Sequence, residues 1–512
     1  MGDVRRANVA LLMLALLYFG LLWLPSFGRQ YGYFIDELYY LACASHPAFG
    51  YVDHPPLSIM LLALVRAVAG DALPVIRFVP ALAGAATILL TGLLARRLGA
   101  NIVGQTVAAG AAMTGSLYHV MFGFYSMNAL ELLFWTATLF VLVEIERQGR
   151  PALWLGIGLI SGLALENKHT FVLLLAGLAV GLLLSPARRH LRSRWLWAGA
   201  AIGVALLVPN LVWQAANGWP SIEFYRNADL YKNVPTPPLD VLVQQVLYMN
   251  PAAAPVWLAG LAFLLLTERG RPYRHLGWMY VALLLLMLVG QKSRPDRIAG
   301  AYSILFAGGG VVIGEAVLRR GWRWVKLALP GALVASGLVL APVGLPLLAP
   351  AATASHAGWL GIVPQIEHGE GKRTALPQWL ADRLGWEHLA DDVTSVVGRL
   401  TPEERARAVI VAPSYGQAGA IERFGRGREL PPVYATQNSY FHWGPPPDGA
   451  DVAIIIGPVD ERFAREAFAE AEIVAVHDCD FCMPWRDEVP IWISRRPREP
   501  WSRFWHLLKH YE

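Results

Sequence analysis

Acidic residues gather in an aromatic, apolar stretch near the N-terminus, where they could act in catalysis. Asp36 and Glu37 are adjacent in the segment RQYGYFIDELYYLACASHPAFGYVDHPPL, and Asp53 and His54 follow directly before two prolines. Apolar surroundings raise the pKa of a carboxyl group towards values useful for a general base. The plainer interpretation is that Asp36 caps a helix beginning at Glu37, whose carboxylate is solvated. The neighbouring Asp53-His54 pair favours a catalytic site.

A second group of candidates is cationic. Lys168 lies in LENKHT, and Lys292, Arg294 and Arg297 lie in QKSRPDR. Fixed positive charge stabilises a phosphate that leaves during a reaction. Such side chains also extend to lipid headgroups at the ends of membrane helices. The cluster of three cations favours a phosphate site, with Lys168 opposite.

Three cysteines are present, and two of them form the sequence Cys479-Asp-Phe-Cys482. We expect a local disulfide between Cys479 and Cys482; a redox pair or half of a metal site are the alternatives. No second Cys/His pair with zinc-site spacing is visible in the sequence.

The elements that must position these residues are mostly membrane helices. Of the 512 residues, 55% are hydrophobic and 16% are charged, and soluble domains carry about 25% charged residues. A span needs roughly 20 apolar residues. Eleven segments meet or approach this length: 7–25, 73–95, 102–123, 127–145, 152–167, 170–184, 195–213, 240–266, 277–291, 298–318 and 327–349.

The distribution of basic residues predicts the orientation of these spans. With the N-terminus in the cytoplasm, cytoplasmic loops hold 17 of the 26 Lys and Arg residues before position 351, as the positive-inside rule requires. The net charge of +5 therefore reflects membrane topology and not nucleic-acid binding. Leu57–Gly70 contains Arg66, and counting it as a span would invert every later loop. We expect this segment to lie in the membrane interface.

Beyond about residue 350 the composition becomes that of a soluble domain. Ala408–Ala412 and Asp451–Gly457 are predicted strands, and Pro402–Ala408 and Glu461–Ala471 are predicted helices. We therefore divide the chain into a transmembrane domain, residues 1–350, and an extracytoplasmic α/β domain, residues 351–512. We therefore expect a multi-pass protein of the plasma (inner) membrane, with its N-terminus in the cytoplasm.

The Asp36-Glu37 pair and the His54-Pro55-Pro56-Leu57 element resemble the protein O-mannosyltransferases and their bacterial relatives, including the aminoarabinose transferases. This resemblance covers about residues 1–350 and is strongest over 31–60. It implies the GT-C fold of glycosyltransferase family 39, an outward-facing site and a polyprenyl-phosphate sugar donor. Asp36 would then be the catalytic base, Glu37 would orient the acceptor, and Asp53 and His54 would complete the wall of the site.

The expected activity is therefore inverting transfer of a sugar to a hydroxyl acceptor, which could be a lipid, a glycan or a protein of the cell envelope. Where some relatives carry an acid at the start of the fourth span, this chain has Asn128, with Glu131 one turn further. No cofactor is certain, but Asp36, Glu37 and Asp53 could hold a divalent metal if they converge. The alternative function is a lipid-linked-sugar transporter or flippase without transferase activity; such a protein favours ionisable groups at mid-membrane.

Overall fold

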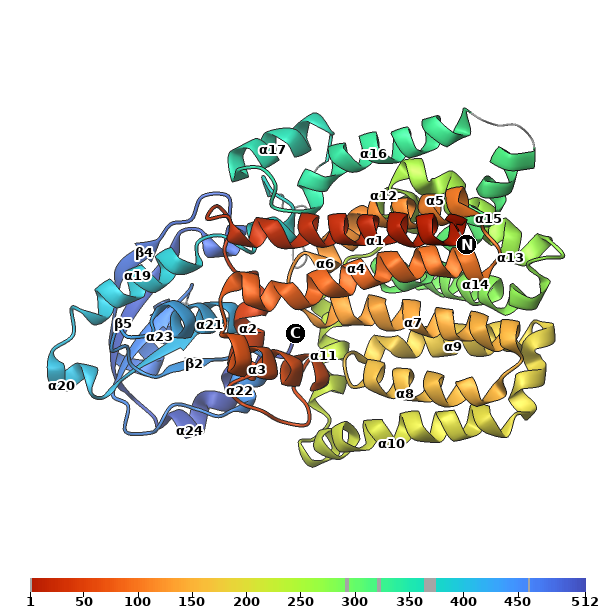
Figure 1. The fold of residues 1–512 in the computed structure, drawn as a ribbon. Helices are drawn as coiled ribbons and strands as arrows, with labels where there is room; N and C mark the ends of the chain where they lie inside the picture. Colours follow the sequence, from red (N-terminus) through yellow and green to blue (C-terminus); the bar gives the residue numbers. More distant parts are fainter. Residues whose placement is uncertain (1, 291–293, 320–323, 363–373, 459–460) are drawn as a thin grey trace.

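The computed structural model describes residues 2–290, 294–319, 324–362, 374–458 and 461–512. Long helices lie side by side in one half of the molecule, and a small sheet with short helices forms the other half (Figure 1). Seven helices of the described residues are long and apolar enough to cross a membrane. They are α1 (Gly2–Trp23), α4 (Leu73–Arg97), α7 (Met127–Gln148), α10 (Arg194–Ala216), α14 (Arg274–Val289), α15 (Tyr302–Arg319) and α16 (Val325–Gly344).

Two further predicted spans are bent helix pairs. α9 (Val172–Leu183) meets η4 (Pro186–Arg192) at 111°, and α12 (Pro238–Tyr248) meets α13 (Ala254–Leu266) at 89°. Counting each pair as one span gives nine among the described residues. The two remaining predicted spans are short helices: α8 (Trp154–Leu165), and α5 (Ile102–Met113), which α6 (Ser116–Phe122) follows. All eleven segments are thus helical, while the number that cross a membrane stays a prediction.

The N-terminal half of α15, which follows the segment containing Arg294 and Arg297, packs closely against α13. A Cβ atom on Gly260 of α13 would lie 1.7 Å from the carbonyl oxygen of Leu305, and one on Gly309 would lie 1.9 Å from that of Val256. Only glycine permits this backbone approach, which is how small residues hold membrane helices together. The 3₁₀ turn η8 (Pro295–Ala301) leads directly into α15.

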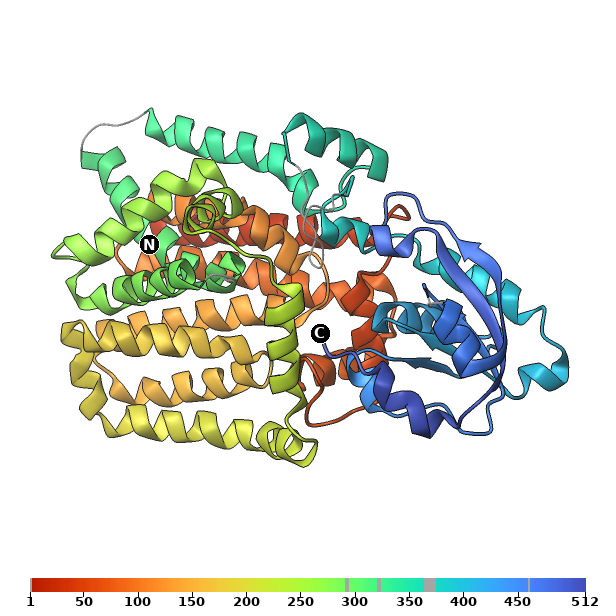
Figure 2. The ribbon, with the colours of Figure 1, turned by 180° about the vertical axis from the view of Figure 1, so that it is seen from behind.

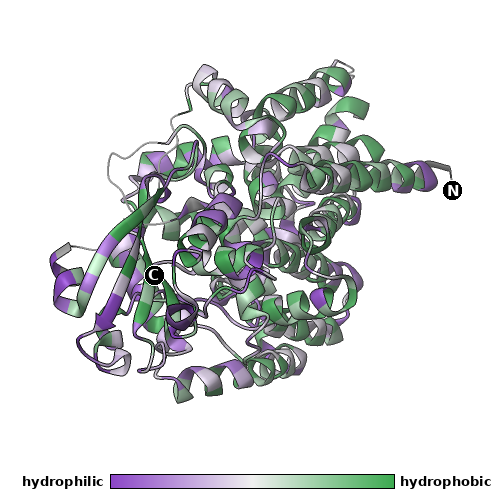
Figure 3. Ribbon diagram, turned by 90° about the vertical axis from the view of Figure 1, so that its left-hand side faces the viewer, coloured by the Kyte–Doolittle hydropathy of each residue, from purple (hydrophilic) through white to green (hydrophobic). Residues whose placement is uncertain are grey.

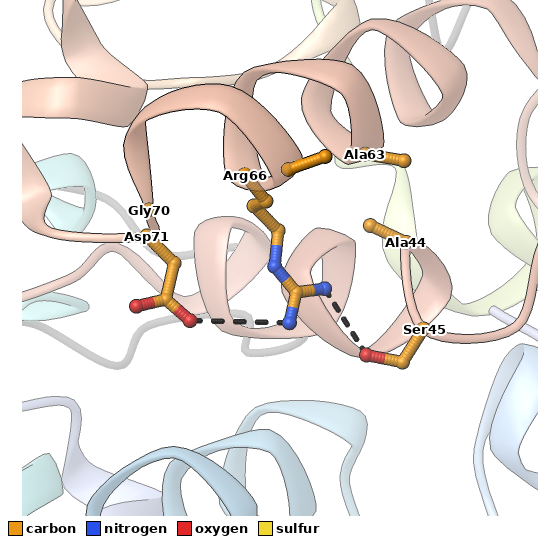
Figure 4. Close-up of a pocket in the computed structure, with 7 residues that line it drawn as sticks. Ala44, Ser45, Ala63, Arg66, Gly70 and Asp71 are labelled. Atoms are coloured by element: carbon orange, nitrogen blue, oxygen red, sulfur yellow. Dashed lines mark hydrogen bonds and ion pairs between the residues drawn. The ribbon is translucent and has the colours of Figure 1, made fainter.

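The segment expected in the membrane interface is the separate helix α3 (Leu57–Ala69). Arg66 donates from Nη1 to the carbonyl oxygen of Leu41 at 2.7 Å and to Ser45 Oγ at 3.0 Å. Its Nη2 lies 3.9 Å from Asp71, and the side chains of Arg66, Ser45 and Asp71 line a surface pocket (Figure 4). Asp71 also pairs with Arg426 at 2.5 Å, so α3 is tied to the C-terminal part of the chain.

The C-terminal domain contains a five-stranded sheet in the order β2-β1-β3-β5-β4. Its strands are β1 (Ala408–Ala412), β2 (Val433–Ala435), β3 (Val452–Ile456), β4 (Phe468–His477) and β5 (Val489–Pro497). β1 is parallel to β2 and β3, whereas β5 is antiparallel to β3 and β4. The two predicted strands are confirmed. The predicted helix 461–471 ends early, because α23 (Glu461–Ala467) passes directly into β4, whose residues pair with β5.

Short helices follow α16. α17 (Pro350–Trp359) packs against α16 itself. The others belong to the part of the chain that contains the sheet: α18 (Gln378–Ala381), α19 (Trp386–Val397), α20 (Pro402–Arg405), α21 (Tyr415–Phe424), α22 (Asn438–His442) and α24 (Trp501–Phe504). Purple, hydrophilic residues are frequent on this domain, while green residues dominate the helical half (Figure 3). The two halves thus differ in the hydropathy of their residues.

One hydrophobic cluster joins the two halves. Helix α2 (Ile35–Cys43) packs against α21 of the C-terminal domain, and both views show them side by side at the junction (Figures 1 and 2). Tyr39 and Leu38 of α2 belong to the same buried cluster as Ile410, Ile454 and Ile493 of the sheet. The acidic segment therefore lies between the membrane helices and the C-terminal domain.

Candidate active site

Asp36 lies in the first turn of α2 and faces the C-terminal domain. Its Oδ1 accepts a hydrogen bond from the hydroxyl of Tyr415, at the start of α21, at 3.2 Å. Burial raises the pKa of Asp36 to about 7, although the cation of Lys232 and the Tyr415 hydrogen bond lower it. The charge of Asp53 also raises this pKa. A carboxyl group that titrates near neutral pH is suited to general base catalysis.

Glu37 is directed away from Asp36 and is fully buried. Arg77 of α4 binds it with two hydrogen bonds, Nε to Oε1 at 2.8 Å and Nη2 to Oε2 at 2.7 Å. The backbone N–H groups of Phe34 and Tyr125 complete its coordination, each at 2.8 Å. Glu37 is therefore not solvated, which differs from the plainer interpretation of the sequence; its expected role in orienting the acceptor stays a prediction. Glu37 caps α2 and holds the helix against α4, because a bidentate carboxylate–guanidinium pair fixes geometry.

Asp53 and His54 lie beside the same helix. The hydroxyl of Tyr39 donates to Asp53 Oδ1 at 2.7 Å and also lies 2.7 Å from Ser439 Oγ, a residue of α22. His54 is fully buried, with its Nε2 3.9 Å from Asp53 Oδ1. Its ring packs against Tyr40 at 4.7 Å between centroids. The structure thus brings Asp36, Asp53 and His54 together around α2, with the C-terminal domain closing one side.

Lys168 forms a compact polar group with Asn128 and Glu131, which lie near the start of α7. Its Nζ donates to Asn128 Oδ1 and to Glu131 Oε2, both at 2.7 Å. Thr170 donates to the other oxygen, Glu131 Oε1, at 2.6 Å. Glu131 therefore holds Lys168 in place, a role that the sequence left open.

Two arginines lie near Lys168 and Glu131. Arg297 belongs to η8, and Arg294 directly precedes it. Arg297 lies within electrostatic reach of both Asp296 and Glu131. Arg294 pairs with Asp296 at 3.2 Å. Lys292 lies outside the described residues. Lys168 also lies within electrostatic reach of Asp296, so the described cations of the two predicted segments meet at one place.

The segment between α10 and α12 connects the cations to the acids. It contains α11 (Pro220–Asn227) and the π-turn η5 (Ala228–Lys232). The charges of Asp53, Glu131 and Arg297 all act on the phenol of Tyr225. The charge of Lys232 lowers the pKa of Asp36. Carboxylates and cations from distant parts of the chain thus surround a common region.

Sequence reasoning missed Tyr415, Ser439, Arg77 and Lys232. Two signals were available in the sequence. Tyr415 begins the helix after β1, at the carboxyl end of a parallel strand, where α/β folds place functional groups. Arg77 is a charged residue inside a predicted span, which indicates a buried partner. Ser439 lies in an aromatic segment, and nothing in its position along the sequence indicates that it belongs to this site.

The cysteine pair differs from its prediction. Cys479 and Cys482 are buried free thiols in the structure, with no disulfide between them. Cys482 Sγ donates to the carbonyl oxygen of Cys479 at 2.9 Å. Hydrogen bonds from Cys482 and His477 lower the pKa of Cys479 to about 5. The two cysteines thus interact within their own segment.

Comparisons with known proteins agree with the resemblance predicted from the sequence. Residues 53–213 match the family model described as dolichyl-phosphate-mannose-protein mannosyltransferase. The lipid A galacturonosyltransferase RgtD of Rhizobium johnstonii is 27% identical over 183 residues. That alignment covers 35% of this chain and 38% of RgtD, so it spans less than half of either protein.

Solved structures extend the likeness to nearly the whole chain. ArnT from Cupriavidus metallidurans in the apo state has a TM-score of 0.60 at 13% identity, covering 94% of this chain and 97% of ArnT. ArnT bound to undecaprenyl phosphate gives a TM-score of 0.54 at 15% identity, covering 95% and 97%. An Archaeoglobus fulgidus oligosaccharyltransferase tethered with an acceptor peptide gives 0.51 at 15% identity, covering 83% and 63%. The GT-C fold predicted from the sequence is confirmed, and none of the relatives described above is a transporter.

Proposed function

From its confirmed resemblance to the GT-C membrane glycosyltransferases, we propose that this chain transfers a sugar from a polyprenyl-phosphate donor to a hydroxyl acceptor. Asp36 acts as the base: it accepts the proton of the acceptor hydroxyl while that oxygen attacks the anomeric carbon. The bond between this carbon and the phosphate oxygen breaks, and the polyprenyl phosphate leaves with the electron pair. Attack opposite to the leaving group inverts the anomeric configuration.

The observation that carries this proposal is the environment of Asp36. Partial burial raises the pKa of its carboxyl group to about 7, and the group lies at the junction of two domains beside Asp53. A structural carboxylate in such a place would be paired, as Glu37 is with Arg77. Asp36 instead keeps a weak hydrogen bond to a phenol, which leaves it able to accept a proton.

The cation group supplies the donor side of the reaction. Lys168 and Arg297 are held near Glu131, so that their charges are fixed before a donor binds. Preorganised positive charge stabilises a developing phosphate dianion without reorganisation cost. Arg294 supports the same group, and we include Lys292 from its position in the sequence. Asp53 and His54 form the wall between the base and these cations.

The orientation and the partners follow from the same proposal. The positive-inside distribution places the C-terminal domain, residues 351–512, and the active site outside the cytoplasm of the plasma membrane. There the donor is membrane-embedded and lipid-linked, in keeping with the undecaprenyl phosphate bound to ArnT. The acceptor is a hydroxyl group of the cell envelope. Lipid A, after which the galacturonosyltransferase RgtD is named, is the first acceptor to test.

Transfer in proteoliposomes tests the proposed function. Purified protein is given radiolabelled sugars on undecaprenyl phosphate, or the same sugars as nucleotide diphosphates, with lipid A, envelope glycans and envelope proteins as acceptors. We expect labelled product from the polyprenyl donor alone, and an inverted linkage by NMR. Transport of labelled donor across the bilayer without any product would support the transporter and contradict the proposal.

A further inference from the structure

The C-terminal domain brings two histidines and an aspartate together, well apart in sequence from the acids of the active site. His388 and Asp392 lie one turn apart on α19, and His477 is the last residue of β4. One donor atom from each of the three lies within 4.8 Å of the other two. Within the described ranges, this is the one group of three or more His, Cys, Asp or Glu residues with that geometry.

The carboxylate of Asp392 lies between the two imidazoles. Its Oδ1 is 3.7 Å from His388 Nε2, and its Oδ2 is 2.6 Å from His477 Nδ1. The two rings are 5.2 Å apart between centroids and are inclined at 62°. His477 is buried at 3% exposure while the His388 side chain is 61% exposed. The group is therefore anchored on its inner side and open to solvent on its outer side.

We propose that His388, Asp392 and His477 bind a divalent cation of the zinc type. Two imidazoles and a carboxylate are a common ligand set for Zn²⁺, with a fourth position for water. With metal–ligand distances of about 2.0–2.2 Å, tetrahedral donors lie about 3.3 Å apart. The separations of Asp392 from His388, 3.7 Å, and from His477, 2.6 Å, lie on either side of this value. A bound ion would take the place of the hydrogen between His477 Nδ1 and Asp392 Oδ2.

The three donors come together in two ways. His477 and Asp392 form a hydrogen bond between β4 and α19, and the spacing of one helical turn brings His388 to the same carboxylate. The Cys479 sulfur forms a hydrogen bond with His477 from the other side. This contact fixes the histidine ring, as partners of metal-ligating histidines do, and Cys479 itself is outside the three-donor group.

An ion at this position would join α19 to the end of β4. Helix α19 also packs against α21, where a Cβ atom on Gly416 would lie 3.1 Å from the indole ring of Trp386. Gly416 follows Tyr415, the residue that hydrogen bonds to Asp36. The site is therefore a structural one, which stabilises the face of the C-terminal domain that covers the active site.

Metal analysis of the full-length protein in detergent tests this inference. The protein is treated with a chelator, reloaded with Zn²⁺ alone, and assayed for bound zinc and for thermal unfolding. We expect about one zinc ion per chain and a melting temperature that rises with zinc concentration, because an ion that binds only the folded state stabilises it. The variants are His388→Ala and Asp392→Asn, with the exposed His506→Ala of the same domain as the matched control.

His388→Ala should weaken zinc binding at least about tenfold and abolish the zinc-dependent rise in melting temperature, while His506→Ala changes neither. His388 is exposed, so its variant is expected to fold. Equal zinc binding by His388→Ala and the parent would overturn the proposal, as would the absence of bound zinc in the parent. Loss of all zinc in Cys479→Ser, with retention in His388→Ala, would place the ion at the cysteines and also overturn it.

Discussion

The hydroxyl of Tyr415 donates a hydrogen bond to Asp36 Oδ1 at 3.2 Å, across 379 residues of sequence. This bond joins α21, the helix that follows β1 of the C-terminal sheet, to the acidic helix α2. The C-terminal domain is consequently part of the candidate site and not an appendage to it. A second hydrogen bond between the C-terminal domain and α2 joins Ser439 to the hydroxyl of Tyr39.

Tyr415→Phe removes this hydrogen bond and leaves the ring. Because the bond lowers the pKa of Asp36, we expect the variant to raise that pKa and to reduce transfer at pH 7 by about two- to tenfold. The measurement is kcat/KM against pH, where the acidic limb should move to higher pH. An unshifted limb would show that Tyr415 does not act on the base.

The pH dependence of the parent enzyme follows from the pKa of about 7 for Asp36. The base must be ionised, so kcat/KM should fall as the pH decreases through about 7 and level off above it. Burial disfavours the ionised form, so the same group lowers folding stability as the pH rises from 3.8 to about 7. A profile that is flat between about pH 5.5 and 8, with a donor in excess, would exclude Asp36 as the titrating base.

Glu37→Gln tests the buried pair with Arg77. It leaves the guanidinium of Arg77, which is 2% exposed, without a carboxylate, and breaking such a pair costs about 3–5 kcal/mol of folding free energy. We expect a large drop in the melting temperature in detergent. Glu223→Gln is the control, since its pair with Lys509 is solvent-accessible and contributes about 1 kcal/mol or less. Similar melting temperatures for both variants would contradict a structural role of Glu37.

Lys168→Ala tests the donor side. If the ammonium stabilises the leaving phosphate, kcat should fall about a hundredfold, with recovery of part of the activity in Lys168→Arg. Arg226→Ala, which removes an exposed cation of α11, should leave kcat unchanged. A lower melting temperature with a normal kcat would show that Lys168 only pairs with Glu131 and does not act on the phosphate.

Much of the fold was predictable because long apolar segments are sufficient to identify membrane helices. The separation of Leu57–Ala69 from the spans was predicted from Arg66, and the structure shows why that charge is tolerated, in bonds to Leu41 and Ser45. The helix at 461–471 was predicted too long because pairing with β5 overrides helix propensity from Phe468 onward.

The site was predictable only where its residues are neighbours in sequence. Asp36, Asp53 and His54 stand within 20 residues, and their types suggest chemistry. Tyr415, Ser439 and Arg77 reach them only through tertiary packing, which spacing along a chain does not reveal. The opposite roles of Asp36 and Glu37 depend on which side of α2 meets Arg77, and two adjacent acids carry no information about that.

Release of polyprenyl phosphate in a single turnover, by the parent and by Asp36→Asn in the same membranes, tests the central claim most directly. The exposed Asp240→Asn is the matched control, and circular dichroism checks that each variant is folded. We predict rapid release by the parent and by Asp240→Asn, and release slowed by about 10³-fold or more in Asp36→Asn. Equal rates in the parent and a folded Asp36→Asn would contradict the assignment of Asp36 as the base.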